Sequence, residues 1–165
     1  MLERITRRLP RFLRLDHRVY HEIADDDRAT LEAALIALLA AALSGVGGLL
    51  TRGPLEFLTW LVAGVLVNWL LWSFVARVVG AVAYHSVAPW AQVARVLGYA
   101  VAPLALGLFG FLGFGLRLVA WALSLYYGFF AVREVMGLRT EAAVVTIATS
   151  SLAVLAINAA VQLLL

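Results

Sequence analysis

Few residues of this 165-residue chain have the types and spacing that catalysis or metal binding requires. His17 and His21 lie one helical turn apart and could supply two ligands of a metal site, but no third ligand stands at a suitable spacing. Cysteine is absent, which excludes thiol catalysis and thiolate metal sites. No pair of carboxylates falls inside an apolar run. The sequence therefore predicts no catalytic, cofactor-binding or metal-binding residue.

Amide side chains within apolar runs are the stronger candidates for a functional role. Asn68 lies near the middle of one run, and Asn158 lies in another. A buried amide in hydrocarbon needs a hydrogen-bonding partner, which is either a group on a neighbouring helix or a substrate. The sequence leaves both open. Arg133 and Glu134 are adjacent at the end of a run, which predicts a position among the lipid headgroups.

The composition excludes several classes of protein. Hydrophobic residues make up 64% of the chain, charged residues make up 14%, and the mean hydropathy is +0.94. A soluble domain is typically about 45–50% apolar and about 25% charged. A soluble enzyme, a nucleic-acid-binding domain and a disordered chain are therefore poor interpretations, and a small polytopic membrane protein remains. All 13 basic residues are arginine, a bias typical of GC-rich bacterial genomes.

Five apolar runs are long enough to span a membrane as helices, because a span needs about 20 residues. The runs cover Thr30–Leu50, Leu55–Val79, Val93–Phe109, Leu116–Met136 and Glu141–Leu164. Gly53 and Pro54 predict a tight turn after the first run, and Gly137 predicts a left-handed turn before the last. Residues 110–115 predict a flexible, glycine-rich connection. The predicted fold class is an all-α integral membrane protein with five transmembrane helices.

An amphipathic segment, residues 1–28, precedes the transmembrane domain of residues 29–165. Its pattern predicts two short helices, the second capped by Asp16, with apolar residues on one face. The opposite face carries the arginines, which are Arg4, Arg7, Arg11, Arg14 and Arg18. Two placements stay open. Either the helices lie in the bilayer interface with these arginines near anionic headgroups, or they pack on the protein's own polar end.

The distribution of arginine predicts the orientation across the membrane, because basic residues favour the cytoplasmic side. With the N-terminus inside, only Arg52 and Arg117 lie outside, and the remaining arginines are cytoplasmic. The sequence therefore predicts a multi-pass protein of the bacterial inner membrane, with its N-terminus in the cytoplasm and its C-terminus outside.

Small residues repeat at every fourth position of the first span. They include Ala33, Ala37, Ala41 and Gly45. Helices in lipid associate through close backbone approach and dispersion, since lipid gives no hydrophobic drive between them. This small-residue ridge therefore predicts close packing against the second span or against the same span of another protomer. A homo-oligomer and a different membrane protein both remain possible partners.

The third span contains a predicted interruption. Pro103 removes the backbone hydrogen bond to the carbonyl of Tyr99, so a kink is expected between these two residues. Gly98, which directly precedes Tyr99, favours the close approach of a neighbouring helix.

Three stretches carry a family resemblance. From Arg95 the chain reads Arg-Val-Leu-Gly-Tyr-Ala-Val-Ala-Pro, which contains Gly98, Tyr99 and Pro103 in the pattern Gly-Tyr-x-x-x-Pro. Residues 132–140 read Val-Arg-Glu-Val-Met-Gly-Leu-Arg-Thr, and residues 19–24 read Val-Tyr-His-Glu-Ile-Ala. Together these stretches resemble the bacterial multi-pass branch of the Yip family, the Ypt/Rab-interacting-protein domain. The resemblance covers nearly the whole chain and implies five spans with a cytoplasmic N-terminus.

The resemblance also guides the functional expectation. Eukaryotic relatives work in membrane traffic with small GTPases and help to shape membranes, whereas the bacterial branch implies a membrane location and little about activity. We expect a non-enzymatic protein that organises membrane or membrane-protein partners. The alternative is a small transporter, channel or lipid-moving protein with a polar path between the helices. Convergence of Asn68, Asn158 and Tyr99 on a cavity would favour the alternative, and pairing between helices would favour the first hypothesis.

The predicted topology can be tested with a reporter enzyme that is active only on one side of the membrane. A reporter fused after Leu165 should be active outside the cytoplasm, because the arginine asymmetry places the C-terminus there. Cytoplasmic activity at this position would contradict the five-span, N-in orientation.

Overall fold

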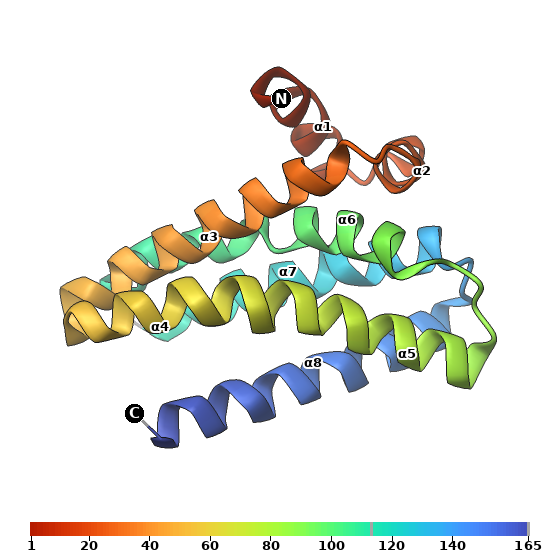
Figure 1. Ribbon diagram of the computed structural model, residues 1–165. Coiled ribbons are helices and arrows are strands. Elements are labelled where there is room, and N and C mark those ends of the chain that lie inside the picture. The colour runs from red at the N-terminus through yellow and green to blue at the C-terminus, as the bar shows by residue number, and fades with distance from the viewer. Residues whose placement is uncertain (113, 165) are drawn as a thin grey trace.

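The structure, a computed structural model, describes residues 1–112 and 114–164, apart from the side chains of residues 51, 52, 111, 114, 162 and 164. Over these ranges the chain forms helices joined by short turns and contains no strand (Figure 1). In chain order the elements are α1 (Leu2–Leu13), α2 (His17–Asp25), α3 (Ala29–Arg52), α4 (Pro54–Val65), the π-helix η1 (Leu66–Leu71), α5 (Trp72–Tyr84), α6 (Trp90–Ala100), the 3₁₀-helix η2 (Ala102–Leu112), α7 (Phe114–Val135) and α8 (Thr140–Leu164).

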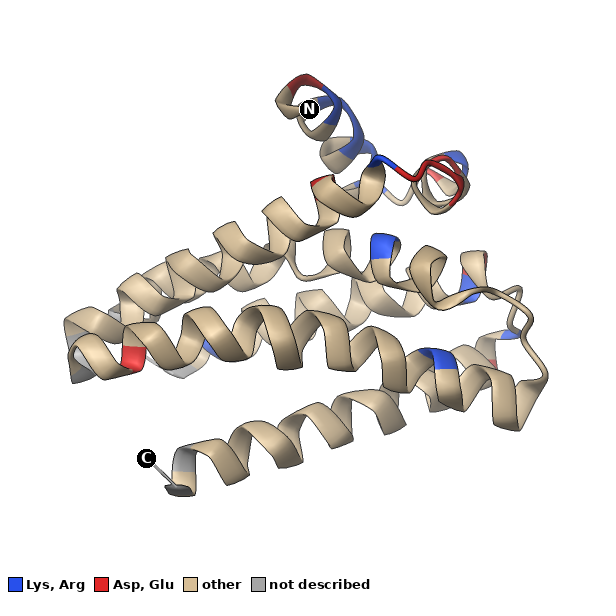
Figure 2. Cartoon of the chain, in the orientation of Figure 1, with Lys and Arg blue, Asp and Glu red and all other residues tan. Residues whose placement is uncertain are grey.

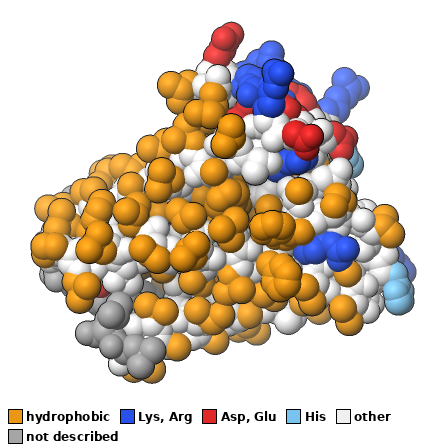
Figure 3. Space-filling view, in the orientation of Figure 1, with side chains coloured by type: hydrophobic (Ala, Val, Ile, Leu, Met, Phe, Trp, Pro, Cys, Tyr) orange, Lys and Arg blue, Asp and Glu red, His pale blue; other side chains and the backbone are white. Residues whose placement is uncertain are grey.

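Five helical stretches of the described chain are long and apolar enough to cross a membrane, which confirms the predicted fold class. They are Ala29–Leu50, Pro54–Tyr84, Trp90–Gly110, Gly115–Val135 and Thr140–Val161. The second stretch joins α4, η1 and α5 into one long helix, and the third joins α6 and η2. Apolar side chains cover most of the bundle in the view of Figure 3. Charged residues gather on α1, α2 and the nearby part of α6 (Figure 2).

The two predicted turns are present, and each has a glycine with positive φ. Gly53 separates α3 from α4 at φ 95°, and Pro54 follows at the first helical position, where its missing N–H costs no hydrogen bond. Gly137, at φ 63°, lies between α7 and α8. Both positions favour glycine because a Cβ is strained in this region of backbone conformation. The helices on either side of each turn therefore run antiparallel.

The small-residue ridge of α3 packs against two other spans of the same chain. Ala33, Ala37 and Ala41 are buried. A Cβ added to Gly64 of α4 would lie 2.4 Å from the Cβ of Ala41, and one added to Gly98 of α6 would lie 2.4 Å from the Cβ of Ala33. Near the end of α3, a Cβ on Gly45 would lie 2.9 Å from the ring of Phe57. The ridge thus contacts the second span, which is one of the two partners that the sequence left open, and also the third.

The third span changes its helix type where proline predicts an interruption. The α-helix ends at Ala100, and a 3₁₀-helix runs from Ala102 through Pro103 to Leu112. Proline removes one backbone donor from the α-helical ladder, and a 3₁₀ stretch is a common result at such positions. The change occurs beside α3, where the hydroxyl of Ser44 donates to the carbonyl of Leu104 at 2.5 Å.

The predicted flexible connection at residues 110–115 is mostly helical, so that prediction was wrong in its conformation. The 3₁₀-helix continues to Leu112 and α7 begins at Phe114, while residue 113 lies outside the described residues. Backbone groups in hydrocarbon must be satisfied within the chain, which favours helix even where glycine is frequent. Composition alone therefore misjudged this segment.

Ala41→Leu should destabilise the protein by about 1–3 kcal/mol, because the larger side chain would collide with the backbone at Gly64. The measurement is thermal unfolding of the purified protein in detergent. Ala156→Leu is the matched control, since Ala156 is exposed on α8 and its replacement meets no neighbouring backbone. Equal unfolding temperatures for the two variants would show that the ridge is not a packing contact.

Candidate functional site

The candidate site forms where α1 and α2 meet the beginning of α3. On α1, Ile5, Arg8 and Phe12 share one face and are buried. On α2, Val19 and Tyr20 are fully buried. The apolar faces of both amphipathic helices therefore pack on the bundle, which is the second of the two placements that the sequence left open. Asp16 caps α2 as predicted, accepting the backbone N–H of Arg18 at 3.1 Å.

Glu32 is the most buried charged residue of this region. It lies in the first turn of α3 and has an exposed fraction of 0%. Its Oε2 accepts a hydrogen bond from Nη1 of Arg8 at 2.9 Å and another from the hydroxyl of Tyr99 at 2.5 Å. Its Oε1 lies 2.9 Å from Nε of Arg4. Two arginines of α1 and one tyrosine of α6 thus surround a single carboxylate.

The guanidinium of Arg8 connects this carboxylate to two others. Its Nε lies 2.9 Å from Glu22, its Nη2 lies 2.9 Å from Asp26, and its Nη1 lies 2.9 Å from Glu32. Each guanidinium nitrogen therefore meets a different acidic residue. We name the residues Arg4, Arg8, Glu22, Asp26, Glu32 and Tyr99 the Glu32 cluster. Figure 2 shows its charged members gathered around α1, α2 and the start of α3.

Burial and charge oppose each other in setting the pKa values of the cluster. Burial raises the pKa of the Glu22 carboxyl, but hydrogen bonds from Arg8 and Arg11 outweigh it and hold that pKa below its ordinary value. The same balance lowers the pKa of Asp26, through Arg8 and the backbone N–H of Arg28. Burial would lower the pKa of Arg8, and its three carboxylate partners raise it instead. All three groups are therefore charged at neutral pH.

Arg95 makes a second connection between α6 and the segment that joins α2 to α3. Its Nη1 donates to the carbonyl of Ala24 at 2.6 Å, and its Nε donates to the hydroxyl of Thr30 at 2.9 Å. Its Nη2 binds Asp27. One turn earlier, Gln92 donates to Asp25 at 3.0 Å. The acidic run before α3 therefore binds side chains of α6 and α1, and Asp26 also accepts the backbone N–H of Arg28.

Aromatic rings fill the space beneath the charges. The ring centroid of Phe12 lies 4.6 Å from that of Tyr20 and 5.6 Å from that of Tyr99. The hydroxyl of Tyr20 donates to the carbonyl of Phe12 at 3.2 Å. Such tilted ring pairs stabilise packing beyond the area that they bury. α1 is therefore joined to the bundle by charge pairs and by apolar contact.

The predicted Arg133 and Glu134 lie at the end of α7, close to α2. The guanidinium of Arg133 binds Glu134 at 2.8 Å and stacks over the ring of Phe130, 5.0 Å from its centroid. Nδ1 of His17 lies 3.2 Å from the same glutamate. No group of three potential metal ligands occurs among the described residues, so this pairing of His17 gives no metal site.

The two candidate amides pair with each other. Nδ2 of Asn158 donates to Oδ1 of Asn68 at 2.8 Å. Asn68 lies in the π-helix η1, which interrupts the α-helical pattern in the middle of the second span. Two tryptophans that follow Asn68 also bond across helices, Trp69 to the carbonyl of Ala94 and Trp72 to the hydroxyl of Ser150. Asn68, Trp69 and Trp72 are therefore all bonded to neighbouring spans.

The five surface arginines predicted from the sequence fall into two groups. Arg4 and Arg11 are partly buried in ion pairs, Arg11 with Asp16 and Glu22 at 2.9 Å each. Arg7, Arg14 and Arg18 are exposed, and Arg7 has its nearest carboxylate 4.0 Å away, on Glu22. Of the five, Arg14 and Arg18 have no side-chain ion pair within the described chain, and Arg7 has only the long one to Glu22, so these three are the most accessible to a lipid headgroup.

Arg8 and Glu32 are the residues that sequence reasoning missed. The prediction of orientation includes Arg8 only as one of the cytoplasmic arginines. Arg8 lies three residues after Ile5, however, and therefore on the buried face of α1. Glu32 is a lone carboxylate one turn inside an apolar span. A charge on the apolar face of one helix and an opposite charge at the start of the next span would have indicated a pair.

Comparison with known proteins was made for the whole chain. The sequence profile of the Yip1 domain matches residues 14–161, a range that contains Glu32, Arg95 and Tyr99 and begins just after α1. A search of the curated proteins and a search of the solved structures gave no match.

Glu32→Gln should loosen α1, because it removes the charge that Arg4 and Arg8 share. We expect a loss of about 1–3 kcal/mol of local stability, read as faster hydrogen exchange in residues 2–13. Glu141→Gln is the control, since that side chain is 81% exposed. Unchanged exchange in α1 would contradict the structural role of Glu32.

Acid should detach α1 and α2 from the bundle. Glu22 and Asp26 have lowered pKa values in the folded protein. Their ion pairs therefore contribute stability at pH values above the ordinary carboxyl pKa of about 4, and this stability is lost as the pH falls through the lowered pKa values. The chain has no cysteine, so Leu2→Cys and Leu31→Cys, both at exposed positions, accept spin labels cleanly. Their distance distribution should be narrow at neutral pH and broad near about pH 3, whereas an unchanged distribution would refute the role of the acidic pairs.

Proposed function

We propose, from the premise that the chain belongs to the Yip1 domain family, that it organises membrane or membrane-protein partners and catalyses no reaction. The chain is a multi-pass membrane protein of that family. We place it in the bacterial inner membrane with α1, α2 and the N-terminus on the cytoplasmic side and the C-terminus outside. The positive-inside asymmetry of its arginines supports this orientation.

The observation that carries the proposal is the firm attachment of α1 and α2 to the spans. The Glu32 cluster and the buried Phe12 and Tyr20 join both helices to α3 and α6. Arg7, Arg14 and Arg18 remain exposed. Because α1 and α2 are attached to the spans, the surface that carries these arginines stays close to the membrane. A basic surface at a constant height above the bilayer suits anionic headgroups, at about 1 kcal/mol for each arginine, or an acidic face of another membrane protein.

The interior of the bundle supports an organising role over transport. The voids around Asn68 and Ser44 have volumes of about 20, 40 and 10 Å³, which suit single water molecules or a few at most. Asn68 and Asn158 use their amides on each other. A path for a solute would require these helices to separate and these hydrogen bonds to break.

The experiment reconstitutes the full chain into vesicles of phosphatidylethanolamine and labelled phosphatidylglycerol. We expect self-quenching of the labelled anionic lipid to increase as it gathers beneath the exposed arginines, while the vesicles stay closed to a small fluorescent solute. The double variant Arg14→Glu, Arg18→Glu should abolish the increase, because each reversal converts attraction into repulsion. High salt should weaken the effect in the unaltered protein.

Arg139→Glu is the matched control, since Arg139 is 90% exposed but belongs to the turn before α8 and not to α1 or α2. It should leave the clustering of the anionic lipid unchanged. Passage of the solute, or protein-dependent exchange of lipid between leaflets, would replace the proposal with the transporter or lipid-moving alternative.

A further inference from the structure

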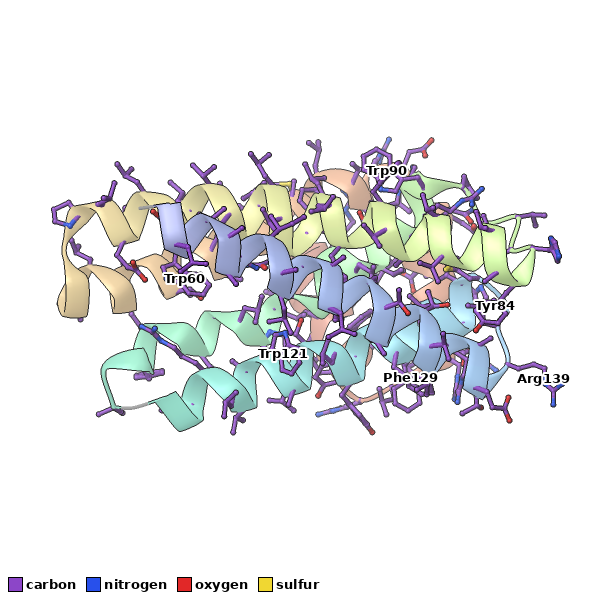
Figure 4. The ribbon with its side chains drawn as sticks, turned by 90° about the horizontal axis from the view of Figure 1, so that it is seen from below. Trp60, Tyr84, Trp90, Trp121, Phe129 and Arg139 are labelled. Carbon is purple, nitrogen blue, oxygen red and sulfur yellow. The ribbon has the colours of Figure 1, made fainter. Side chains whose placement is uncertain are left out.

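The end of the bundle opposite to the Glu32 cluster is hollowed, in contrast to its filled middle. A cavity of about 310 Å³ lies between α4, α7 and α8, and its lining includes Glu56, Trp60, Arg117 and Asn158. Figure 4 shows Trp60 beside the last turns of α8. A second hollow of about 330 Å³, lined by α4, the start of η1 and α8, shares Thr59, Ala63 and Val161 with the first. The two hollows therefore adjoin each other, and together we name them the depression.

Arg117 is the polar group that makes the cavity a candidate binding site. Its side chain is partly buried, yet no hydrogen bond or ion pair joins it to another residue that the structure describes. The partly buried Arg4, Arg11 and Arg133 have carboxylate partners, whereas Arg77 of α5, like Arg117, has none among the described residues. A guanidinium offers five N–H donors, and an unsatisfied charge within a membrane protein marks a ligand or ion site. Two oxygens of one phosphate can accept two parallel hydrogen bonds from a single guanidinium.

The second hollow has the chemistry of a hydrocarbon chain. Its lining is apolar apart from Thr59, and Leu58, Val62 and Leu66 expose more than half of their surface at four-residue intervals along α4 and the start of η1. This groove extends about 12 Å along the helix, from the level of the cavity toward the middle of the span. A phosphate at Arg117 and an acyl chain in the groove match the two parts of one phospholipid.

The charge of the cavity selects among phospholipids. Glu56 lines the same cavity as Arg117, and its Oε1 accepts a hydrogen bond from the indole of Trp60 at 2.9 Å. Among the described lining residues, one carboxylate and one guanidinium balance each other, which suits a zwitterionic headgroup over an anionic one. A primary ammonium can donate to a carboxylate, whereas a trimethylammonium cannot.

We propose that this depression binds one phospholipid with a primary ammonium headgroup, its phosphate on Arg117, its ammonium toward Glu56 and one acyl chain along Leu58, Val62 and Leu66. The site is distinct from the Glu32 cluster and does not rest on the organising function proposed above. It requires only that this end of the bundle lie at the level of the headgroups, where Glu56 and Arg117 are accommodated.

The test uses the full chain reconstituted in vesicles of equal parts phosphatidylethanolamine, phosphatidylcholine and phosphatidylglycerol, then released for native mass spectrometry. We expect one retained phospholipid per chain, with phosphatidylethanolamine enriched over the other two. Arg117→Gln should reduce this occupancy about tenfold, and Arg117→Lys should restore part of it because the charge returns without the planar fork. Val62→Trp should reduce occupancy by filling the groove.

Each variant has a matched control that leaves the depression untouched. Arg77→Gln removes a partly buried arginine from α5, and Val82→Trp enlarges an exposed valine of the same helix. Thermal unfolding of every variant shows whether it is folded, and Arg117→Lys provides the comparison if Arg117→Gln is not.

Three results would overturn the proposal. Equal lipid retention in the Arg117 variants and their controls would identify adventitious lipid only. Retention without preference for phosphatidylethanolamine would refute the headgroup assignment. A dimer that Val62→Trp dissociates, with no lipid bound, would show that a second copy of the chain occupies the groove.

Discussion

The buried carboxylate of Glu32 is the constraint on which the polar end of the molecule depends. An ionised carboxylate removed from water is destabilised by several kcal/mol unless opposite charge and hydrogen bonds replace its hydration. Glu32 has no exposed surface, so its compensation comes entirely from Arg4, Arg8 and Tyr99. Because the arginines belong to α1 and the tyrosine to α6, one buried side chain sets the positions of three helices relative to one another.

Close backbone packing is what allows that compensation. Ala33 and Gly98 approach so closely that no Cβ fits on the glycine, and each is the direct neighbour of a cluster residue, Glu32 in α3 and Tyr99 in α6. The Gly-Tyr pair of the family motif therefore has a physical explanation in this chain. The glycine permits the approach of α3, and the tyrosine donates to the carboxylate that the approach buries.

The fold followed from the sequence more completely than the site did. Span lengths, the turns at Gly53 and Gly137 and the Asp16 cap depend on local composition and backbone geometry, which a single sequence displays. Glu32 and Arg8 belong to different helices, and their pairing depends on how those helices pack. The arginine count that predicts orientation grouped Arg8 with the other cytoplasmic arginines, because such a count ignores which face of a helix a residue occupies. The helical conformation of residues 110–112 was missed because the prediction relied on glycine content. It gave too little weight to the need of backbone groups in a membrane protein for hydrogen bonds within the chain.

The ion pairs also bear on the use of arginine counts to predict orientation. Arg4, Arg8, Arg11 and Arg95 all bind carboxylates in the folded protein, so they add little net charge to its surface. The positive-inside bias nonetheless depends on basic residues near the spans and only weakly on acidic ones. It operates while the chain inserts, before α1 packs on α3 and these pairs form. The same arginines can therefore direct insertion first and bind Glu22, Asp26, Asp27 and Glu32 afterwards, which explains how a segment rich in both charges predicts an orientation and still forms a largely neutralised junction.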